Sequence, residues 1–301
     1  MGLGRARSVA VVGLRALVVT VEAYVASGLP GFQVIGSSGS AALQAADRVR
    51  AALGAIGVTL PSRKVLVSLA PAEVPKAGAR FDLAVAAAVL QELGTLGEGA
   101  LAGTALLGEL ALDGAVRSVP AVLPSAAFLP GTGLHRVLVA DGDAAEAALV
   151  GGLEVVPVAD LREAVDVLRG ERPARPVPDP ERGPELPRPG DLADVRGQPE
   201  ARRALEVAAA GGHHLLLLGP PGCGKSMLAR RLPSILPPLT REQALEVAAV
   251  RSVAGRRAGD AGDRPVLDHV APFRAPHHRA SATALLGGGS GIARPGELSL
   301  A

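Results

Sequence analysis

The chain has 301 residues, of which 48% are hydrophobic and 2% aromatic, and its formal net charge is +2. This length indicates two domains, whose cores must consist largely of leucine, valine and alanine. No apolar run approaches the roughly 18 residues of a membrane-spanning helix, and the run after the basic N-terminus is too interrupted for a secretory signal. The single cysteine, Cys223, excludes an internal disulfide and a cysteine-based zinc site. We therefore expect a cytoplasmic protein without a membrane segment.

Strand-like and helix-like patterns alternate through residues 1–170 and predict a mixed α/β domain. Strands are expected at 16–25, 64–69, 136–140 and 153–158. Helices are expected at 40–54, 82–93, 143–150 and 160–169. The second of these helices should be mostly buried, and the first should face the core with Leu43, Ala46, Val49 and Leu53.

A β-hairpin is expected over residues 104–119. Asp113 and Gly114 lie between two apolar segments there. This dipeptide favours a two-residue turn in which both central residues have positive φ. The hairpin would pair the segment before the turn with the segment after it.

Residues 171–190 contain prolines at short intervals and no apolar periodicity. This composition is typical of a stiff, extended linker, so the domain boundary is placed there. Beyond it we expect a helix at 199–210, a strand at 214–218, a helix from Lys225 that is broken at Pro233, Pro237 and Pro238, and a helix at 240–250. The remainder of the chain, rich in glycine, proline and histidine, has no assignable pattern.

Residues 219–226 fit the phosphate-binding loop pattern G-x-x-x-x-G-K-S. The eight residues are Gly219, Pro220, Pro221, Gly222, Cys223, Gly224, Lys225 and Ser226. Glycines let backbone N–H groups turn towards phosphate oxygens, and the start of the following helix adds positive potential. We expect Lys225 to reach the β- and γ-phosphates of ATP and Ser226 to ligate Mg²⁺. The apolar residues 215–218 support this interpretation, because such a loop follows a buried strand.

Three other features have less specific interpretations. Cys223 occupies a variable position of the loop, where a tolerated small residue is a simpler explanation than a redox switch. His213 and His214 precede the expected strand and fit a structural role better than a catalytic one. The adjacent His277 and His278 suggest a metal only weakly, since no third ligand lies nearby in the sequence.

Several longer motifs resemble the YifB/ComM family of magnesium-chelatase-like AAA+ ATPases, and the resemblance covers nearly the whole chain. The motifs are 194–226, which includes Asp-Val-Arg-Gly-Gln and the phosphate loop; 271–278, Ala-Pro-Phe-Arg-Ala-Pro-His-His; 287–290; 294–299; and, in the first domain, 28–32, 69–73 and 75–83. One departure is Gly-Ser-Ser-Gly-Ser at 36–40, where the family tends to have a Gly-Leu-Pro-like turn.

The resemblance implies both a fold and a function. The fold is a Lon-protease/ribosomal-S5-like α/β domain over residues 1–170, a linker over 171–190 and the N-terminal part of an AAA+ domain over 191–301. ATP and Mg²⁺ are the implied cofactors, and the implied assembly is a homo-hexamer that remodels DNA by branch migration or helicase-like action. Val195, Gly197 and Gln198 lie in a segment that is near the adenine in such proteins.

The likeness to Lon raises the question of a peptidase. By alignment with the Lon segment that carries the nucleophilic serine, the serine position holds Arg80. The region expected to supply the lysine partner holds Leu-Pro-Ser at 123–125. A serine–lysine dyad needs a hydroxyl and an amine within hydrogen-bond reach, so we expect no peptidase activity.

ATP hydrolysis needs an acidic strand in addition to the phosphate loop. In relatives, the segment resembling 295–300 leads almost directly into that strand. The resemblance therefore implies that the chain is the N-terminal part of a longer protein, that it contains no catalytic residue, and that it binds nucleotide without turnover. A magnesium-chelatase subunit is the alternative, although chelatase ATPase subunits lack the N-terminal domain.

The segment 271–290 has two open interpretations. Arg274, His277 and His278 are candidates for contacts with phosphates or a partner, beside a mobile loop at 287–289 that could face a central pore. Alternatively, the segment is a structured insertion whose polar groups satisfy its own turns.

Overall fold

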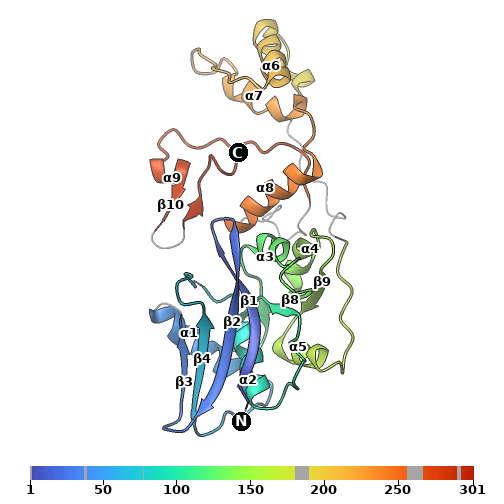
Figure 1. The fold of residues 1–301 in the computed structure, drawn as a ribbon. Helices are drawn as coiled ribbons and strands as arrows, with labels where there is room; N and C mark the ends of the chain where they lie inside the picture. The colour runs from blue at the N-terminus through green and yellow to red at the C-terminus, as the bar shows by residue number, and fades with distance from the viewer. Residues whose placement is uncertain (1, 37–38, 77, 180–189, 256–266, 290–292) are drawn as a thin grey trace.

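Figure 1 shows the computed structural model of the chain, which describes residues 2–36, 39–76, 78–179, 190–255, 267–289 and 293–301. The first half forms a seven-stranded mixed sheet with the order β3-β4-β2-β1-β5-β8-β9. β2 is antiparallel to β1 and β4, and the other neighbours are parallel. The strands are β1 Gly4–Val12, β2 Arg15–Ala26, β3 Gly31–Ile35, β4 Lys64–Ala70, β5 Thr104–Leu106, β8 Arg136–Ala140 and β9 Glu154–Val158. The α/β fold class is confirmed, and the likeness to a Lon or S5 domain stays a prediction.

Helices cover both faces of this sheet. They are α1 Gly39–Ala55, α2 Asp82–Glu92, α3 Val122–Phe128, α4 Ala144–Ala147 and α5 Leu161–Leu168. α1, α2 and α5 share one core with Leu138 of β8, whereas α3 and α4 pack on the other face with Val137 and Val139. Successive side chains of a strand point to opposite faces, so a strand covered on both sides is apolar at nearly every position.

The close approach of α2 to β1 explains why the side of β1 that faces α2 is built from small residues. Ala6, Ser8 and Ala10 are buried in it, and a Cβ atom on Gly4 would collide with the carbonyl oxygen of Ala88 in α2. The α2 helix is itself buried along almost its whole length, as its apolar sequence predicts.

An ion pair ties α1 to the start of α2. Arg48 Nε lies 2.6 Å from Asp82 Oδ2, and its Nη2 lies 3.1 Å from Oδ1. The backbone N–H of Leu110 also donates to Asp82 Oδ2, over 3.3 Å. Burial raises the pKa of Asp82 to about 6, although the hydrogen bond and charge of Arg48 oppose this shift.

Several expectations for this domain need correction. β1, β3 and α3 were not expected, and Leu43, assigned to the core face of α1, is 70% exposed. The other three residues assigned to that face are buried. Of the departure at 36–40, residues 37 and 38 lie outside the described residues.

The expected hairpin is present but shorter. β6 Glu109–Leu110 pairs with β7 Val116–Arg117, and the segment at 104–106 belongs to the large sheet as β5. The connection has three residues, because Ala111 donates to the carbonyl of Ala115 and accepts from Gly114. Gly114 has φ +90°, and Asp113 has no positive φ. The prediction of a two-residue turn was therefore wrong. The hairpin is closed by a three-residue connection whose last residue, Gly114, is in the left-handed conformation.

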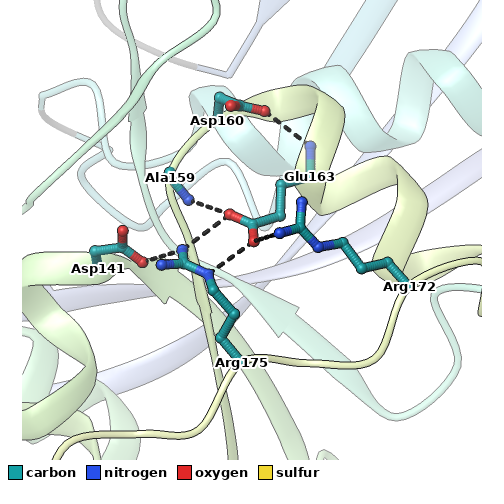
Figure 2. Close-up of polar contacts among 6 residues, drawn as sticks. All are labelled: Asp141, Ala159, Asp160, Glu163, Arg172 and Arg175. Atoms are coloured by element: carbon teal, nitrogen blue, oxygen red, sulfur yellow. Dashed lines mark hydrogen bonds and ion pairs between the residues drawn. The ribbon is translucent and has the colours of Figure 1, made fainter.

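The first part of the predicted linker is anchored to the sheet domain. Figure 2 shows Glu163 of α5 receiving Arg175 and Arg172, whose nitrogens lie 2.7 and 3.6 Å from its Oε1. Arg175 also bonds Asp141, and Val177 packs against the core on the α3/α4 face. Residues 180–189 lie outside the described residues. Residues 173–179 have no assigned secondary structure, and these contacts hold this part of the predicted linker against the sheet domain. The domain boundary stays a prediction.

Replacing Glu163 with glutamine is expected to lower the free energy of unfolding by about 1–2 kcal/mol at pH 7. This range is discounted because water screens Arg175, whose side chain is 37% exposed. Burial raises the pKa of Glu163, but its hydrogen bonds to Ala159 and Arg175 and the arginine charges outweigh burial and lower it below 4.5. The contribution is therefore present above that pH and is lost as pH falls through the lowered folded-state value.

Urea unfolding of both proteins between pH 3 and pH 7 would measure this difference. The matched control is Glu171→Gln, since the Glu171 side chain is 59% exposed and, among the described residues, forms an ion pair only with Arg169, at 3.5 Å. Equal losses of unfolding free energy in the two variants would contradict the role given to Glu163. So would a difference between Glu163→Gln and the unaltered chain that stays constant down to pH 3.

The second half of the chain contains α6 Pro199–Gly211, α7 Lys225–Ala229, α8 Arg241–Val253, α9 Ala282–Leu286, β10 Gly287–Gly288 and β11 Arg294–Pro295. Thr240 and Gln243 form a capping box at the start of α8.

The α8 helix packs against α3 of the sheet domain. The Ser252 carbonyl accepts from the N–H of Ala121 over 3.0 Å, and Arg241 donates to the carbonyl of Leu149 over 3.1 Å. Figure 1 shows α6 and α7 together at the far end of the molecule, beyond α8. Among the described residues, no helix has the length and apolarity to cross a bilayer.

Candidate nucleotide-binding site

The phosphate loop, residues 219–226, turns on three glycines. Gly219, Gly222 and Gly224 have positive φ, which other residues adopt only with strain. α7 begins at Lys225, as expected. The Lys225 ammonium donates to the carbonyls of Gly219 and Pro220, over 2.7 Å in each case. The lysine side chain thus folds across the mouth of the loop, within reach of any anion held there.

The segment 195–198 lies beside this loop. Gln198 donates from Nε2 to the carbonyl of Cys223 over 3.2 Å. Gln198 itself has φ +54°, a strained value for a residue with a side chain, and it directly precedes α6. Val195 is buried in a small core with Leu205 of α6 and Leu228 of α7. The structure therefore brings together the two segments that the sequence assigned to nucleotide, while their binding role stays a proposal.

The strand expected before the loop is not formed. Residues 213–220 have no assigned secondary structure, and Leu216 and Leu218 are 79% and 83% exposed. A central parallel strand is stable only when neighbouring strands accept its hydrogen bonds and helices cover its faces. No strand pairs with this segment within the described part of the chain. Residues 214–218 have the apolar pattern of a strand, but the described structure contains no neighbouring strand for them to pair with.

The metal-binding expectation rests on Ser226 alone. Its side chain lies at the exposed start of α7. No group of three or more histidine, cysteine or acidic side chains is placed to hold a metal within the described ranges. The thiol of Cys223 is free, and its sulfur lies 3.5 Å from Lys225 Nζ. Ser226 could serve as one Mg²⁺ ligand, with nucleotide phosphates and water completing the shell.

Within the described residues 271–289, Arg274 forms an ion pair with Glu297 near the end of the chain. Arg274 Nε lies 2.6 Å from Glu297 Oε2, and the rings of the exposed His277 and His278 lie 4.1 Å apart. Gly287 and Gly288 form β10, which pairs with β11. Because Gly287 and Gly288 are paired with β11, the strand pairing favours a structured insertion over a mobile glycine loop up to residue 288.

Arg80, at the position aligned with the Lon serine, contacts Ser125 of the region expected to supply the lysine partner. Arg80 donates from Nη2 to Ser125 Oγ over 2.6 Å, and this hydroxyl donates to the carbonyl of Ala121 over 2.6 Å. The sequence singled out Arg80 and the region 123–125, but the contact between residues 45 positions apart had no local signal. No neutral amine meets this hydroxyl, because its partner is a guanidinium.

Incubation of the purified chain with unfolded casein is expected to release no peptides. The serine hydroxyl is held by an arginine, which is too basic to accept its proton at neutral pH. Gel and mass-spectrometric analysis would detect cleavage. Hydrolysis that Ser125→Ala abolishes would overturn this expectation.

Comparison with known proteins agrees with this arrangement. The family profile described as magnesium chelatase, subunit ChlI, matches residues 191–301, and the profile described as subunit ChlI of Mg-chelatase matches residues 21–143. The sheet domain and the glycine-rich loop thus place the chain among the magnesium-chelatase-like proteins.

Individual relatives narrow this class. The chain is 47% identical to an uncharacterized protein of Mycobacterium tuberculosis, 40% to YifB of Escherichia coli and 38% to the competence protein ComM of Haemophilus influenzae. Each alignment covers 100% of the chain and 58–59% of the relative. The chain belongs to the YifB/ComM family of magnesium-chelatase-like proteins. It spans about three fifths of the length of these relatives.

Proposed function

We propose that the chain carries the ATP-binding part of a YifB/ComM-type AAA+ ATPase. The observation that carries the proposal is the phosphate loop with Gln198 bonded to its backbone and Lys225 folded across its mouth. In the proposed site the backbone of 219–226 holds the phosphates, Ser226 ligates Mg²⁺, and Val195, Gly197 and Gln198 border the adenine. A bound Mg²⁺ would neutralise phosphate charge during hydrolysis.

For the full-length protein we propose a homo-hexamer that uses ATP to remodel DNA. Support comes from the family and from the identity to the competence protein ComM. The test is ATPase activity of the full-length protein with and without branched or single-stranded DNA, with DNA affinity measured across a salt series. Stimulation by DNA and affinity that falls with salt are expected. Hexamers that neither bind DNA nor respond to it would exclude this substrate.

A metal chelatase is the second candidate, because both matching family profiles describe a magnesium-chelatase subunit. The test is insertion of Mg²⁺ into a porphyrin by full-length protein with chelatase partner subunits. Metallation that requires this protein and ATP would favour the chelatase over DNA remodelling.

The 301-residue chain by itself is proposed to bind ATP without turnover. Binding and hydrolysis measured side by side on the same preparation would test this. Hydrolysis that Lys225→Ala abolishes would show that the chain contains a catalytic acid.

A further inference from the structure

Part of one face of the large sheet, over β2, β4 and β3, is not covered by a helix. α1 and α2 pack on the face to which Val19, Val21 and Ala23 point, and these three side chains are fully buried. On the opposite face, Ala16 and Val18 at the start of β2 pack against the core that contains α3 and α4. Beyond Val18, no helix among the described residues lies over this second face, as Figure 1 shows. We call this uncovered area the open face.

The centre of the open face is aromatic and apolar. Tyr24 of β2, the only tyrosine of the chain, is 42% exposed there. Directly opposite it on β4 is the half-buried Leu66, which in turn lies opposite the exposed Gln33 of the edge strand β3. In the neighbouring row of the sheet, Ile35 of β3 is 49% exposed. The open face therefore presents an accessible aromatic ring beside aliphatic side chains.

The charge of the open face is positive. Strand register places four charged side chains on it, and Arg5, Arg7 and Lys64 against Glu22 give a net charge of +2. Arg5 and Glu22 form an ion pair, with Nε 3.0 Å from Oε1. The side chain of Arg7 donates to the neutral hydroxyl of Thr20. The uncompensated positive charges are therefore those of Arg7 and Lys64.

These two cations lie on either side of Tyr24 along the strands. Arg7 is opposite Thr20, four residues before Tyr24 on β2, and Lys64 is opposite Ala26, two residues after it. At about 3.3 Å per residue, these offsets are about 13 Å and about 7 Å. A single mononucleotide is too short to reach both cations, whereas a chain of several nucleotides can.

Single-stranded nucleic acid has the chemistry that this arrangement fits. Its phosphates are spaced along the chain, and its unpaired bases can stack on aromatic side chains. In a duplex the faces of the bases are hidden in the base stack, so Tyr24 would have no base to contact. An acidic protein would meet the positive charge but has no need of the aromatic ring between the two cations.

We propose that the open face binds single-stranded nucleic acid, with a base stacked on Tyr24 and phosphates held by Arg7 and Lys64. This inference rests on the proposed DNA-remodelling function and adds to it a contact surface on the sheet domain. The surface shares no residue with the phosphate loop.

The test is fluorescence anisotropy of a labelled oligothymidylate of about 12 nucleotides, titrated with the 301-residue chain over a salt series. Binding should be saturable and should weaken as salt rises, with a logarithmic slope of about 0.7 for each phosphate contact. A duplex of the same length and poly-glutamate should compete at least tenfold more weakly than the unlabelled strand. Absence of saturable binding, or equal competition by the duplex or by poly-glutamate, would each overturn the proposal. Parallel titration with oligouridylate would show whether DNA or RNA is the preferred strand.

Variants of two residues locate the contact. Tyr24→Ala should weaken binding about tenfold or more, the effect of losing one stacked base. Tyr24→Phe should bind within about twofold of the unaltered chain, because its ring stacks equally well. Arg7→Met should weaken binding and reduce the salt slope by about 0.7. The matched control is Arg162→Met, since Arg162 is exposed on α5, which packs on the other face of the sheet, and this variant should bind as the unaltered chain does.

Thermal unfolding would verify that each variant is folded. Unchanged affinity in folded Tyr24→Ala and Arg7→Met proteins would refute the open face as the site. Should Arg7→Met fail to fold, the comparison of Tyr24→Ala with Tyr24→Phe decides, and equal affinity of these two would refute the stacking contact.

The full-length protein separates this inference from the function on which it rests. If its Tyr24→Ala variant keeps full DNA affinity and DNA-stimulated ATPase activity, the open face is wrong and DNA remodelling stands. If the 301-residue chain binds the strand through Tyr24 but full-length hexamers do not respond to DNA, the open face stands and DNA remodelling is wrong.

Discussion

Replacing Lys225 with alanine is expected to lower the affinity of the chain for ATP by about 100-fold or more. A lysine between two phosphates makes charge-assisted hydrogen bonds worth about 1.5–3 kcal/mol each. Loss of about 3 kcal/mol corresponds to roughly 100-fold in the dissociation constant. The ammonium now donates to the carbonyls of Gly219 and Pro220, so ATP has to replace two neutral acceptors with charged ones, which favours binding.

Titration of the chain with a fluorescent ATP analogue would measure this loss. The chain offers a matched control, because it has only three lysines and Lys64 lies at the start of β4 in the large sheet. Lys64→Ala should bind nucleotide as the unaltered chain does. If both lysine variants retain full affinity, residues 219–226 are not the ATP site.

Replacing Arg48 with alanine is expected to destabilise the sheet domain by about 3 kcal/mol at pH 8, the lower end of the range for breaking a buried ion pair. The lower end applies because the Arg48 side chain is 21% exposed, while that of Asp82 is 1% exposed. Without the guanidinium, a buried carboxylate keeps only the 3.3 Å bond from Leu110 among the contacts described here. α1 would also lose its polar tie to the start of α2.

The pH dependence distinguishes this cause from lost packing. The folded-state pKa of Asp82 is raised to about 6 by burial, so this group favours the folded state at low pH, and that contribution is lost as pH rises through 6. Arg48 opposes the shift, and its removal raises the pKa further. The loss in Arg48→Ala should therefore be larger at pH 8 than at pH 5 in urea unfolding.

A double variant provides the control for this prediction. Arg48→Met with Asp82→Leu removes both charges and keeps much of the volume, so it should recover a large part of the lost stability. If the loss in Arg48→Ala is the same at pH 5 and pH 8, charge at Asp82 is not its cause.

The elements of the sheet domain that could be predicted are those with a local signal. β4 has alternating burial and α2 is apolar from Leu83 to Leu90, so pattern alone identified both. β1 was missed because the buried positions on its α2 side hold glycine, alanine and serine, whose size is set by the close approach of α2, as at Gly4 and Ala88. Small residues carry little hydrophobic contrast, so the strand period was not visible.

In the candidate site, too, features with a local sequence signal were predicted and features that depend on distant residues were not. The phosphate loop is a contiguous motif and was identified residue by residue, and Gln198 was identified through family resemblance. The strand at 214–218 was wrong, because a strand depends on partners that a local window does not contain. The Arg80–Ser125 contact joins residues 45 positions apart and needed the folded sheet to become visible.

The chain is attached to the sheet domain at two places on either side of the phosphate loop. Arg172 and Arg175 hold the outgoing segment at Glu163, and α8 holds the returning segment at α3. A domain attached at one point can rotate about any axis through that point, whereas a domain attached at two points can rotate only about the line that joins them. Rotation about the line that joins these two attachments is therefore the rigid-body movement of residues 219–226 that would keep both sets of contacts.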